Sequence, residues 1–473
     1  MRKFDTQVQH LKNKVLCEVA KSAWDDVLVD KITEIPEKIV PGNIPTARCC
    51  VYKERAIVSK RVKLAIGGDR SNKNVIEVID IACDECPVGG YELTTACRGC
   101  IAHHCQDICP KGAIIFDTNQ TGHIDKTKCI ECGLCANACP YNAIVNNIRP
   151  CERACKMDAI SIGVSLEAKI DNSKCTACGA CVYHCPFGAI NDKSYILNVI
   201  DFIKKSDNNQ KYKMYAVIAP SIAGQFSNAK IGQVVAGIKA LGFDKVVEAA
   251  LGADMVAVAE SKELIEKGFL ISSCCPAFVK CVENEFEELS DYVSTSLSPM
   301  ATISKYIKQK DENAKVVFIG PCTAKKEEIQ LEKVKDYVDC AITFVELQAL
   351  FDSKELDITS LPEETLDEAS EFGRGFAHCG GLADAVKEGL KEQGYDDFEL
   401  KAITCDGIEE CKKVLLKAKL GKLDANFIEG MACVGGCIGG AGCLTHSIKS
   451  KVEADKYSQS ATAKSIINSI NKL

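Results

Sequence analysis

Two cysteines with the spacing of metal ligands lie in a glycine-rich segment near the end of the chain. Cys433 and Cys437 are four residues apart within 427–442, which reads FIEGMACVGGCIGGAG, and five of its last eight residues are glycine. Cysteine thiolates bind soft metals and iron–sulfur clusters. Glycine lets the backbone approach a bulky inorganic group closely and supplies turns with positive φ. Taken alone, the segment is equally consistent with a loop that carries two buried thiols.

The strongest local motif is a run of four cysteines that occurs twice. Residues 129–140 and 175–186 both follow the pattern C-x2-C-x2-C-x3-C-P. This run is typical of ferredoxins, in which three of its cysteines bind one cluster and the fourth binds a neighbouring cluster. A zinc site would need two separated CxxC pairs instead. Degenerate copies end at Cys109 and Cys155 with the same following Ala-Ile pair, so the sequence predicts two dicluster ferredoxin-like modules in tandem.

The crossing pattern of such modules predicts which cysteines share a cluster. Three sets are complete, each with three cysteines of one run and a fourth from its companion: Cys97, Cys100, Cys105 and Cys139; Cys129, Cys132, Cys135 and Cys109; Cys175, Cys178, Cys181 and Cys155. We therefore expect at least three accessory [4Fe–4S] clusters. Clusters in this number indicate a path for electrons rather than a structural staple.

A fourth set is incomplete within the repeat. Cys151 and Cys185 remain, but apolar residues occupy the two positions where further cysteines would stand. The pair Cys83 and Cys86 has the CxxC spacing that would complete the set. We therefore predict a fourth accessory [4Fe–4S] cluster. The alternative is that this site is empty and the pair consists of ordinary thiols, which leaves three accessory clusters.

Two further segments place the glycine-rich loop in a wider pattern. Residues 271–279 read ISSCCPAFV, and residues 318–327 read FIGPCTAKKE. The order SCCP, PCxxKK and MACxGGC resembles the three signatures of the iron-only [FeFe]-hydrogenases. The resemblance implies an H-cluster, which joins a [4Fe–4S] cluster to a two-iron subsite with CO, CN⁻ and azadithiolate ligands. Four cysteines match its protein ligands, the last of them shared with the subsite: Cys275, Cys322, Cys433 and Cys437.

The same resemblance implies roles for residues around the subsite. Ala219, Pro220, Ser221 and Lys325 match the residues that surround the cyanide ligands, and Met431 matches a residue that packs on the subsite. Donors are needed there because an anionic ligand in an apolar cavity requires hydrogen bonds, and an ammonium group gives charge-assisted ones. Outside this context, Lys325 would be interpreted as an exposed lysine on a helix.

A proton path is implied as well. Cys274 stands beside a ligand without matching one, so its thiol can pass a proton to the cofactor. Glu263, Ser294 and Glu260 match the relay of the family, and we expect Glu260 to lie nearer the surface. The two glutamates are three residues apart and share one face of a helix. The alternative is that they belong to a solvated helix face.

Several positions depart from the usual motifs of the family. Gly320 replaces a methionine before the Pro-Cys pair, Phe278 replaces a tryptophan, and Met300 replaces a glutamine. The glycine tail also lacks its usual Gln-Pro ending. With these departures, the chain resembles a divergent branch of the family that is similar to the group B clostridial enzymes. The predicted ligands and relay residues are unchanged.

The elements that must position these residues divide the chain into three regions. We expect a helical region over 1–80, a tandem ferredoxin-like α+β domain over 81–204 and an α/β catalytic domain over 205–473. In the first region, prolines predict an extended connector around 36–45. In the last region, strand candidates alternate with helix candidates: 214–219, 316–319 and 341–344 against 231–241, 260–267 and 278–289. This alternation is typical of α/β layers, which present their sites at element ends.

Composition excludes several classes of protein. The formal net charge of −7 argues against a nucleic-acid partner, and no apolar run is long enough to predict a membrane span. Thirty cysteines in a long chain that opens without a signal peptide indicate reduced, metal-bound thiols and a cytoplasmic location. Cys49 and Cys50 receive no role. The basic stretch 53–67 suits an acidic electron-transfer partner, and a solvated helix face fits it equally well.

The sequence therefore predicts an enzyme for 2 H⁺ + 2 e⁻ ⇌ H₂ that exchanges electrons with ferredoxin or a similar small redox protein. One alternative is an H₂ sensor, a class that usually carries an appended signalling domain. A second is a hydrogenase-like iron–sulfur assembly protein, which would have no use for Cys274, Lys325 and the glutamates together. A third is a subunit of a NAD-linked complex, which would need a partner chain because no nucleotide-binding glycine motif follows a strand.

Overall fold

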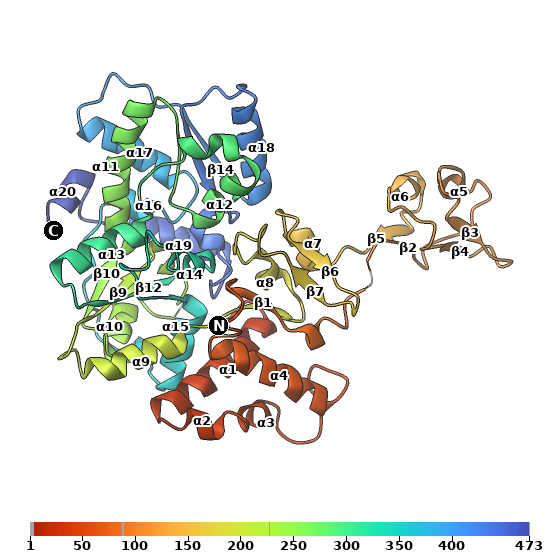
Figure 1. Ribbon diagram of the computed structural model, residues 1–473, viewed down its shortest axis with the longest axis horizontal. Helices are drawn as coiled ribbons and strands as arrows, with labels where there is room; N and C mark the ends of the chain where they lie inside the picture. Colours follow the sequence, from red (N-terminus) through yellow and green to blue (C-terminus); the bar gives the residue numbers. More distant parts are fainter. Residues whose placement is uncertain (1–3, 88, 227, 473) are drawn as a thin grey trace.

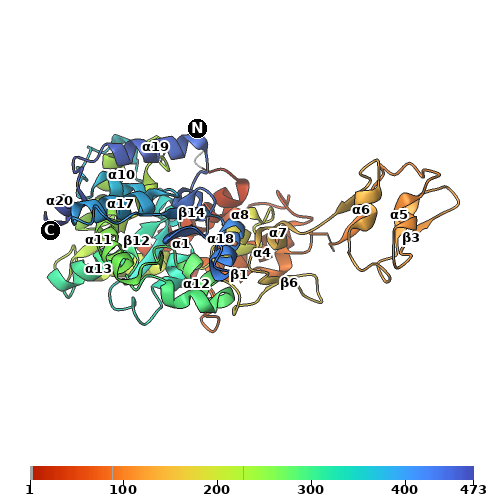
Figure 2. The same ribbon diagram turned by 90° about the horizontal axis from the view of Figure 1, so that it is seen from above.

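The computed structural model describes residues 4–87, 89–226 and 228–472. Most helices and strands form one large body, and a small module projects from it (Figure 1). This outer module comprises residues 91–146 and remains separate from the body in the view turned by 90° (Figure 2). No helix in the described ranges has both the length and the apolar character that a membrane span requires.

The N-terminal region forms helices that pack on the catalytic region. α1 (Gln7–Trp24) begins after Thr6, whose hydroxyl accepts a hydrogen bond from the backbone N–H of Gln9, while the side chain of Gln9 accepts one from the backbone of Thr6. This reciprocal cap satisfies two backbone donors that a helix start otherwise leaves free. The buried face of α1 packs against α15 (Phe344–Ser353) and α4 (Val51–Ala65).

The connector between α1 and α4 is helical in part. It contains α2 (Leu28–Lys31) and α3 (Ile35–Ile39), so the prediction of an extended connector is wrong for its first residues. Pro36 lies in the first turn of α3. A proline fits there because the backbone N–H that it lacks has no partner within a first helical turn.

Each iron–sulfur module consists of two short antiparallel strand pairs and two short helices. The outer module contains β2 (Tyr91–Leu93), α5 (His104–Asp107), β3 (Ile114–Phe116), β4 (Gly122–Ile124), α6 (Leu134–Ala138) and β5 (Ile144–Asn146). The inner module contains β1 (Ile76–Val78), η1 (Asp80–Ala82), α7 (Pro150–Ala154), β6 (Ile160–Ile162), β7 (Ala168–Ile170), α8 (Ala180–His184) and β8 (Ile190–Asp192). Because β1 pairs with β8, a strand that precedes the outer module completes the inner one.

Two parallel sheets form the catalytic region. Their strand orders are β10-β9-β12-β13 and β11-β15-β14. The strands are β9 (Met214–Ile218), β10 (Lys245–Glu248), β11 (Leu270–Ile271), β12 (Lys315–Gly320), β13 (Cys340–Thr343), β14 (Ala402–Asp406) and β15 (Phe427–Met431). All three strand candidates of the sequence are strands here. Parallel strands end at one edge of a sheet, so the loops that follow them lie close together.

Helices connect these strands and cover the sheets (Figure 1). They are α9 (Ile196–Ser206), η2 (Pro220–Ile222), α10 (Ile231–Leu241), α11 (Ala249–Lys267), α12 (Pro276–Glu285), η3 (Glu287–Tyr292), α13 (Pro299–Lys310), α14 (Ala324–Glu328), α15, η4 (Ile358–Ser360), α16 (Glu371–Gly375), α17 (Gly381–Glu392), α18 (Ile408–Lys419), η5 (Gly436–Gly439), α19 (Ile448–Gln459) and α20 (Ile466–Ile470). The alternation of strands and helices confirms the predicted α/β class.

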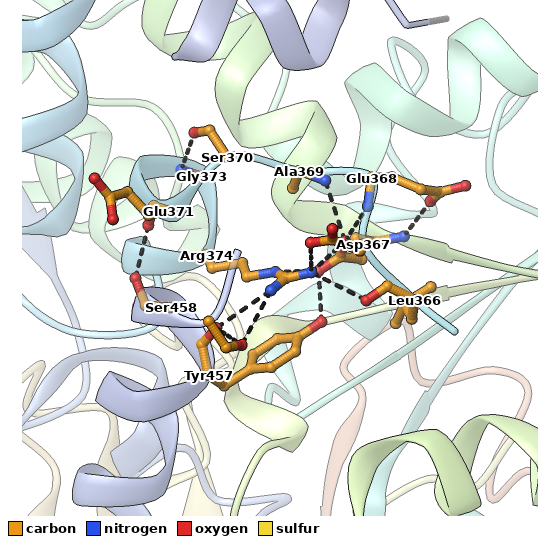
Figure 3. A network of polar contacts seen from close by, with 12 residues as sticks. Leu366, Asp367, Glu368, Ala369, Ser370, Glu371, Gly373, Arg374, Tyr457 and Ser458 are labelled. Carbon is orange, nitrogen blue, oxygen red and sulfur yellow. Dashed lines mark hydrogen bonds and ion pairs between the residues drawn. The ribbon is translucent and has the colours of Figure 1, made fainter. Parts of the chain in front are cut away.

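A buried ion pair fastens the last helices to the first sheet (Figure 3). Arg374 of α16 donates from Nε to Glu248 at the end of β10 over 2.7 Å, and its second branch contacts Asp367 at 3.0 Å. The hydroxyl of Tyr457 in α19 donates to the same Glu248 carboxylate. A buried guanidinium requires such anionic partners, since an unpaired charge away from water is costly.

Candidate active site

Loops at the carboxyl ends of strands bring the four predicted H-cluster ligands together. Cys275 follows β11 and precedes α12, Cys322 follows β12, Cys433 follows β15, and Cys437 lies in η5. Burial raises the pKa of Cys437 to about 12, and the nearby Cys275 and Cys322 act in the same direction. Burial and the same two thiols also raise the pKa of Cys433. The four sulfur atoms therefore face one another from three different strands.

Two glycines of the terminal loop are required by close packing. Gly436 has a φ of +82°, and a Cβ added there would lie 2.7 Å from the backbone nitrogen of Cys379. A Cβ on Gly440 would lie 2.5 Å from the carbonyl oxygen of Pro321, the residue before Cys322. Only glycine accepts the first conformation without strain and leaves room at the second position. The glycine run thus lets the loop of Cys437 close against the loop of Cys322.

The chemistry of this donor set suits iron. Burial raises the pKa of all four thiols, including that of Cys322 to about 12, so without a metal they hold protons. A cluster replaces these protons with iron, which removes the cost of burying thiolates. The ammonium group of Lys325 lies beside the set: it donates to the carbonyl oxygen of Cys274 over 3.3 Å and pairs with Glu328 at 2.6 Å.

The residues matched to the cyanide environment lie at the same edge. Ala219 and Pro220 follow β9, whose partner β12 leads to Cys322. The Ser221 hydroxyl is completely buried and has no hydrogen-bond partner among the described residues. Buried hydroxyls are normally satisfied, so this one is free to donate to a bound group. Met431, at the end of β15, is buried as well.

The predicted relay residues lie close to one another. The Ser294 hydroxyl donates to Glu263 over 2.9 Å, and it also lowers the pKa of Glu260, so it lies between the two carboxylates. The larger effect on Glu260 is burial, which raises its pKa to about 7. Burial is the main reason why the pKa of Cys274 is raised, and the charge of Glu260 raises it further. A group with a pKa near neutrality is suited to both accepting and donating protons.

The order of the two glutamates is the reverse of our expectation. Glu260 is fully buried and its charge influences Cys274, whereas Glu263 lies outward and pairs with Lys267 at 2.9 Å. The expectation that Glu260 lies nearer the surface is therefore wrong. The physical reason is the direction of α11: its buried face points at the loop of Ser273, whose N–H and hydroxyl both donate to Glu260 over 3.3 Å.

Three of the predicted accessory sets are also brought together. One set lines a small enclosed cavity: Cys97, Cys100, Cys105 and Cys139. A second set lines a cavity of about 810 Å³ that extends to Cys433: Cys155, Cys175, Cys178 and Cys181. In the third set, Cys129 and Cys109 raise the pKa of Cys135 beyond the effect of burial, and Cys132 is exposed. The second set is thus the one beside the four-cysteine site of the catalytic region.

The fourth set has the same arrangement. Cys83, Cys151 and Cys185 are buried within one core of the inner module. Burial raises the pKa of Cys151 to about 11, and Cys185 and Cys86 contribute in the same direction. The CxxC pair that precedes the outer module therefore lies where the repeat lacks two cysteines.

The remaining cysteines of the catalytic region behave as small apolar residues, and one carboxylate was missed. Five thiols are completely or almost completely buried, whereas Cys379 is half-buried: Cys281, Cys340, Cys405, Cys411 and Cys443. Glu429 of β15 is completely buried and accepts hydrogen bonds from the backbone N–H groups of Gly380 and Ala383, each over 2.8 Å. Its position within a buried strand was the signal that could have identified it.

Comparison with known families supports this architecture. Residues 212–441 match the family described as "Iron only hydrogenase large subunit, C-terminal domain". Residues 123–145 and 168–191 match the "4Fe-4S binding domain" family. These matches confirm the predicted fold class, an iron-hydrogenase-type catalytic domain preceded by ferredoxin-like iron–sulfur segments.

Individual relatives are distant. Iron hydrogenase 1 of Clostridium pasteurianum is 30% identical over 375 residues, which cover 67% of this chain and 64% of that protein. This chain thus spans less than two thirds of that relative. The human nuclear prelamin A recognition factor is 22% identical over 52% of this chain and 67% of its own length. A solved structure of apo [FeFe]-hydrogenase HydA1 from Chlamydomonas reinhardtii superimposes with a TM-score of 0.49 at 21% identity, covering 59% of this chain and 93% of that one.

Proposed function

We propose that this chain catalyses the reversible reduction of protons to H₂ at an H-cluster, as a divergent enzyme similar to the group B branch. The observation that carries the proposal is the arrangement of two adjacent cysteines. Cys275 raises the pKa of the other three predicted ligands, whereas the Cys274 thiol is influenced by the Glu260 carboxylate as well as by Cys275, which fits a different task. A protein that only held a [4Fe–4S] cluster would need the first arrangement and not the second.

The residues at the site fit the group that the proposal requires. Cys275, Cys322, Cys433 and Cys437 would hold the cluster, and Ser221 and Lys325 would donate to its cyanide ligands. When bound, the H-cluster supplies the exchange of two electrons with protons and H₂. The buried Ser221 hydroxyl without a partner and the buried ammonium of Lys325 support this assignment.

The chain's own residues provide a route for protons. Cys274 holds a proton at its sulfur, because burial raises its pKa well above the ordinary value. Glu260 can return that proton from its carboxyl group, whose pKa is about 7. Ser294 then links Glu260 to Glu263, and the ion pair of Glu263 with Lys267 lies close to the solvent.

Electrons would enter through the accessory clusters from ferredoxin or a similar small redox protein in the cytoplasm. The cavity shared by Cys155, Cys175, Cys178, Cys181 and Cys433 makes this set the direct donor to the catalytic cluster. The outer module projects from the body, which leaves it open to a partner on most sides (Figure 2).

The test is hydrogen turnover by the full chain loaded with iron, sulfide and a synthetic two-iron subsite. With reduced methyl viologen as the electron donor, we expect H₂ formation by the wild type and by the Cys281→Ala control, whose thiol is buried on α12, the helix that follows Cys275. An assembly protein would bind [4Fe–4S] clusters and form no H₂. H₂ formation too slow to exceed that of the free synthetic subsite would contradict the proposal.

A further inference from the structure

Three arginines surround the site formed by Cys83, Cys86, Cys151 and Cys185, and we call this assembly the arginine-lined site. Each arginine donates to a backbone carbonyl within two residues of one of these cysteines. The three hydrogen bonds run from Arg48 Nη2 to Ala82 O (3.1 Å), from Arg149 Nε to Pro87 O (2.9 Å) and from Arg61 Nη2 to Phe187 O (3.0 Å). The guanidinium groups are therefore fixed against the segments that carry the four thiols.

Two of these arginines have further N–H groups that are buried without a partner among the described residues. These are Nη2 of Arg149, and Nε and Nη1 of Arg61. Arg149 is completely buried, and Arg61 is only 5% exposed. Among the described residues, neither has a carboxylate within ion-pair distance, whereas Arg48 has Asp84 at 3.5 Å. Arg374 provides the contrast, because its buried guanidinium pairs with both Glu248 and Asp367.

Two buried guanidinium groups without carboxylates require another source of negative charge. The nearest candidates are the four cysteines. Burial raises the pKa of Cys83 and Cys86, while the charge of Arg149 acts in the opposite direction on both. Four thiolates around a [4Fe–4S] core carry a net negative charge, and the sulfur atoms of such a cluster accept hydrogen bonds. One cluster would satisfy both the charges and the free N–H groups.

We propose that the arginine-lined site holds a [4Fe–4S] cluster that accepts hydrogen bonds from Arg61 and Arg149, and that this cluster has the most positive reduction potential of the accessory set. Reduction adds one electron and therefore one negative charge to the cluster. Fixed positive charges and hydrogen bonds to the sulfur atoms stabilise the reduced form more than the oxidised form, which raises the potential. In the outer module, by contrast, Arg98 lies beside its cysteines but is exposed to water.

The arginine-lined site lies beside the path that electrons would take to the catalytic region. Cys178 and Cys181 pack against the core that contains Cys83, Cys151 and Cys185, and α7 packs on α8, so the arginine-lined site adjoins the cluster set that leads to the catalytic region. An electron delivered to the accessory path would therefore settle here first. The inference deepens the electron path of the proposed function, but it concerns cluster binding and potential only.

The experiment uses the full chain reconstituted with iron and sulfide and without the two-iron subsite, so its result does not depend on hydrogen turnover. Ligand counting predicts five clusters and about 20 iron atoms per chain, and about 16 in the double variant Cys83→Ser/Cys86→Ser. A redox titration followed by electron paramagnetic resonance then identifies the signal that this variant lacks. We expect that signal to be the first to appear as the potential is lowered.

Arginine variants test the cause of the high potential. In Arg61→Gln and in Arg149→Gln, we expect the reduced-to-oxidised ratio of this one signal to fall about tenfold at a fixed potential, a shift of about 59 mV for one electron. Arg61→Lys and Arg149→Lys keep the charge and should shift less. Arg98→Gln is the matched control, and its exposed charge should change no midpoint by a comparable amount because water screens it.

Three results would overturn the inference. The first is an unchanged iron count in the Cys83→Ser/Cys86→Ser variant, which would show that no cluster binds there. The second is a signal of this site that appears last in the wild-type titration, a result that holds even if the glutamine variants fail to fold. The third is a midpoint that is the same in the wild type and in folded Arg61→Gln and Arg149→Gln.

Discussion

The outer module and the catalytic region hold their cysteines in opposite ways. The apolar core of the outer module consists of Cys105, Ile114, Cys135 and Ile144, so half of it is cysteine. The catalytic region instead surrounds its site with large apolar cores built on two parallel sheets. Small scaffolds need a metal or another staple because their core buries too little apolar surface. The comparison indicates that clusters complete the fold of the outer module, whereas the catalytic site is added to a domain that folds around its sheets.

Removal of iron should therefore have the largest effect of the changes proposed here. It should unfold the outer module and leave the sheets of the catalytic region folded. After treatment with a chelator, we expect the backbone amides of 91–146 to lose their protection from hydrogen exchange, as in an unfolded chain. Amides of β9 and β12 should keep theirs. Mass spectrometry of exchanged peptides measures both in one sample. Equal retention of protection in the two regions would show that the outer module does not depend on its clusters.

Loss of one catalytic ligand should abolish function and spare the fold. In Cys275→Ser, we expect the catalytic cluster and the two-iron subsite to be absent and H₂ turnover to fall below detection. Iron content should decrease by about four atoms per chain, and the circular dichroism spectrum should stay the same. Cys281→Ala, on the helix that follows Cys275, is the matched control, and it should keep the iron. A Cys275→Ser protein with full iron content would contradict the ligand assignment.

Substitution of Cys274, the neighbour of Cys275, should impair proton transfer and leave cofactor binding intact. In Cys274→Ser, we expect normal iron content and a fall in turnover of about 10²–10⁴-fold, because a hydroxyl is a much weaker acid than a thiol. Iron analysis and the viologen assay on the same preparation decide the matter. Full activity would exclude Cys274 from the proton path.

Substitution of Glu260 should lower turnover more than substitution of Glu263, because Glu260 is the more deeply buried of the two. Glu260→Gln removes a buried group that water cannot replace, so we expect a fall in turnover of about 10²-fold or more. Glu263→Gln should cost less, since its site adjoins solvent and Lys267. The exposed Glu266 of the same helix provides the control variant Glu266→Gln, which should leave the rate unchanged. A larger loss in Glu263→Gln than in Glu260→Gln would refute the order of the path.

Buried carboxylates also predict a modest pH dependence of stability. The pKa of Glu260 is raised from 4.5 to about 7 in the fold, so the folded state binds this proton more tightly than the unfolded state. Its contribution is fully present below about pH 4.5 and is lost as the pH rises to about 7, by at most about 3 kcal/mol. Chemical denaturation across this range should show a shallower decline for Glu260→Gln. An identical decline in both proteins would contradict the raised pKa.

The sequence was informative about the site to different degrees. Cysteine spacing was sufficient to group the three complete accessory sets, because ferredoxin runs impose their own pairing. The fourth set needed a CxxC pair from outside the repeat and remains a prediction. The order of Glu260 and Glu263 was not predictable, since helical spacing places both on one face without saying which end of that face is buried. The arginines of the inner module gave no signal, because Arg48, Arg61 and Arg149 are far apart in the chain and only the fold brings them to the same four thiols.

The infrared spectrum of the loaded chain tests the central proposal most directly. Carbon monoxide and cyanide bound to iron absorb in a region where protein does not, so their bands report the two-iron subsite without requiring turnover. We predict these bands in the wild type and in Cys274→Ser, and their absence in Cys437→Ser, which lacks the shared thiolate. A wild-type protein with a complete set of [4Fe–4S] clusters and no such bands after loading would contradict hydrogen chemistry at this site.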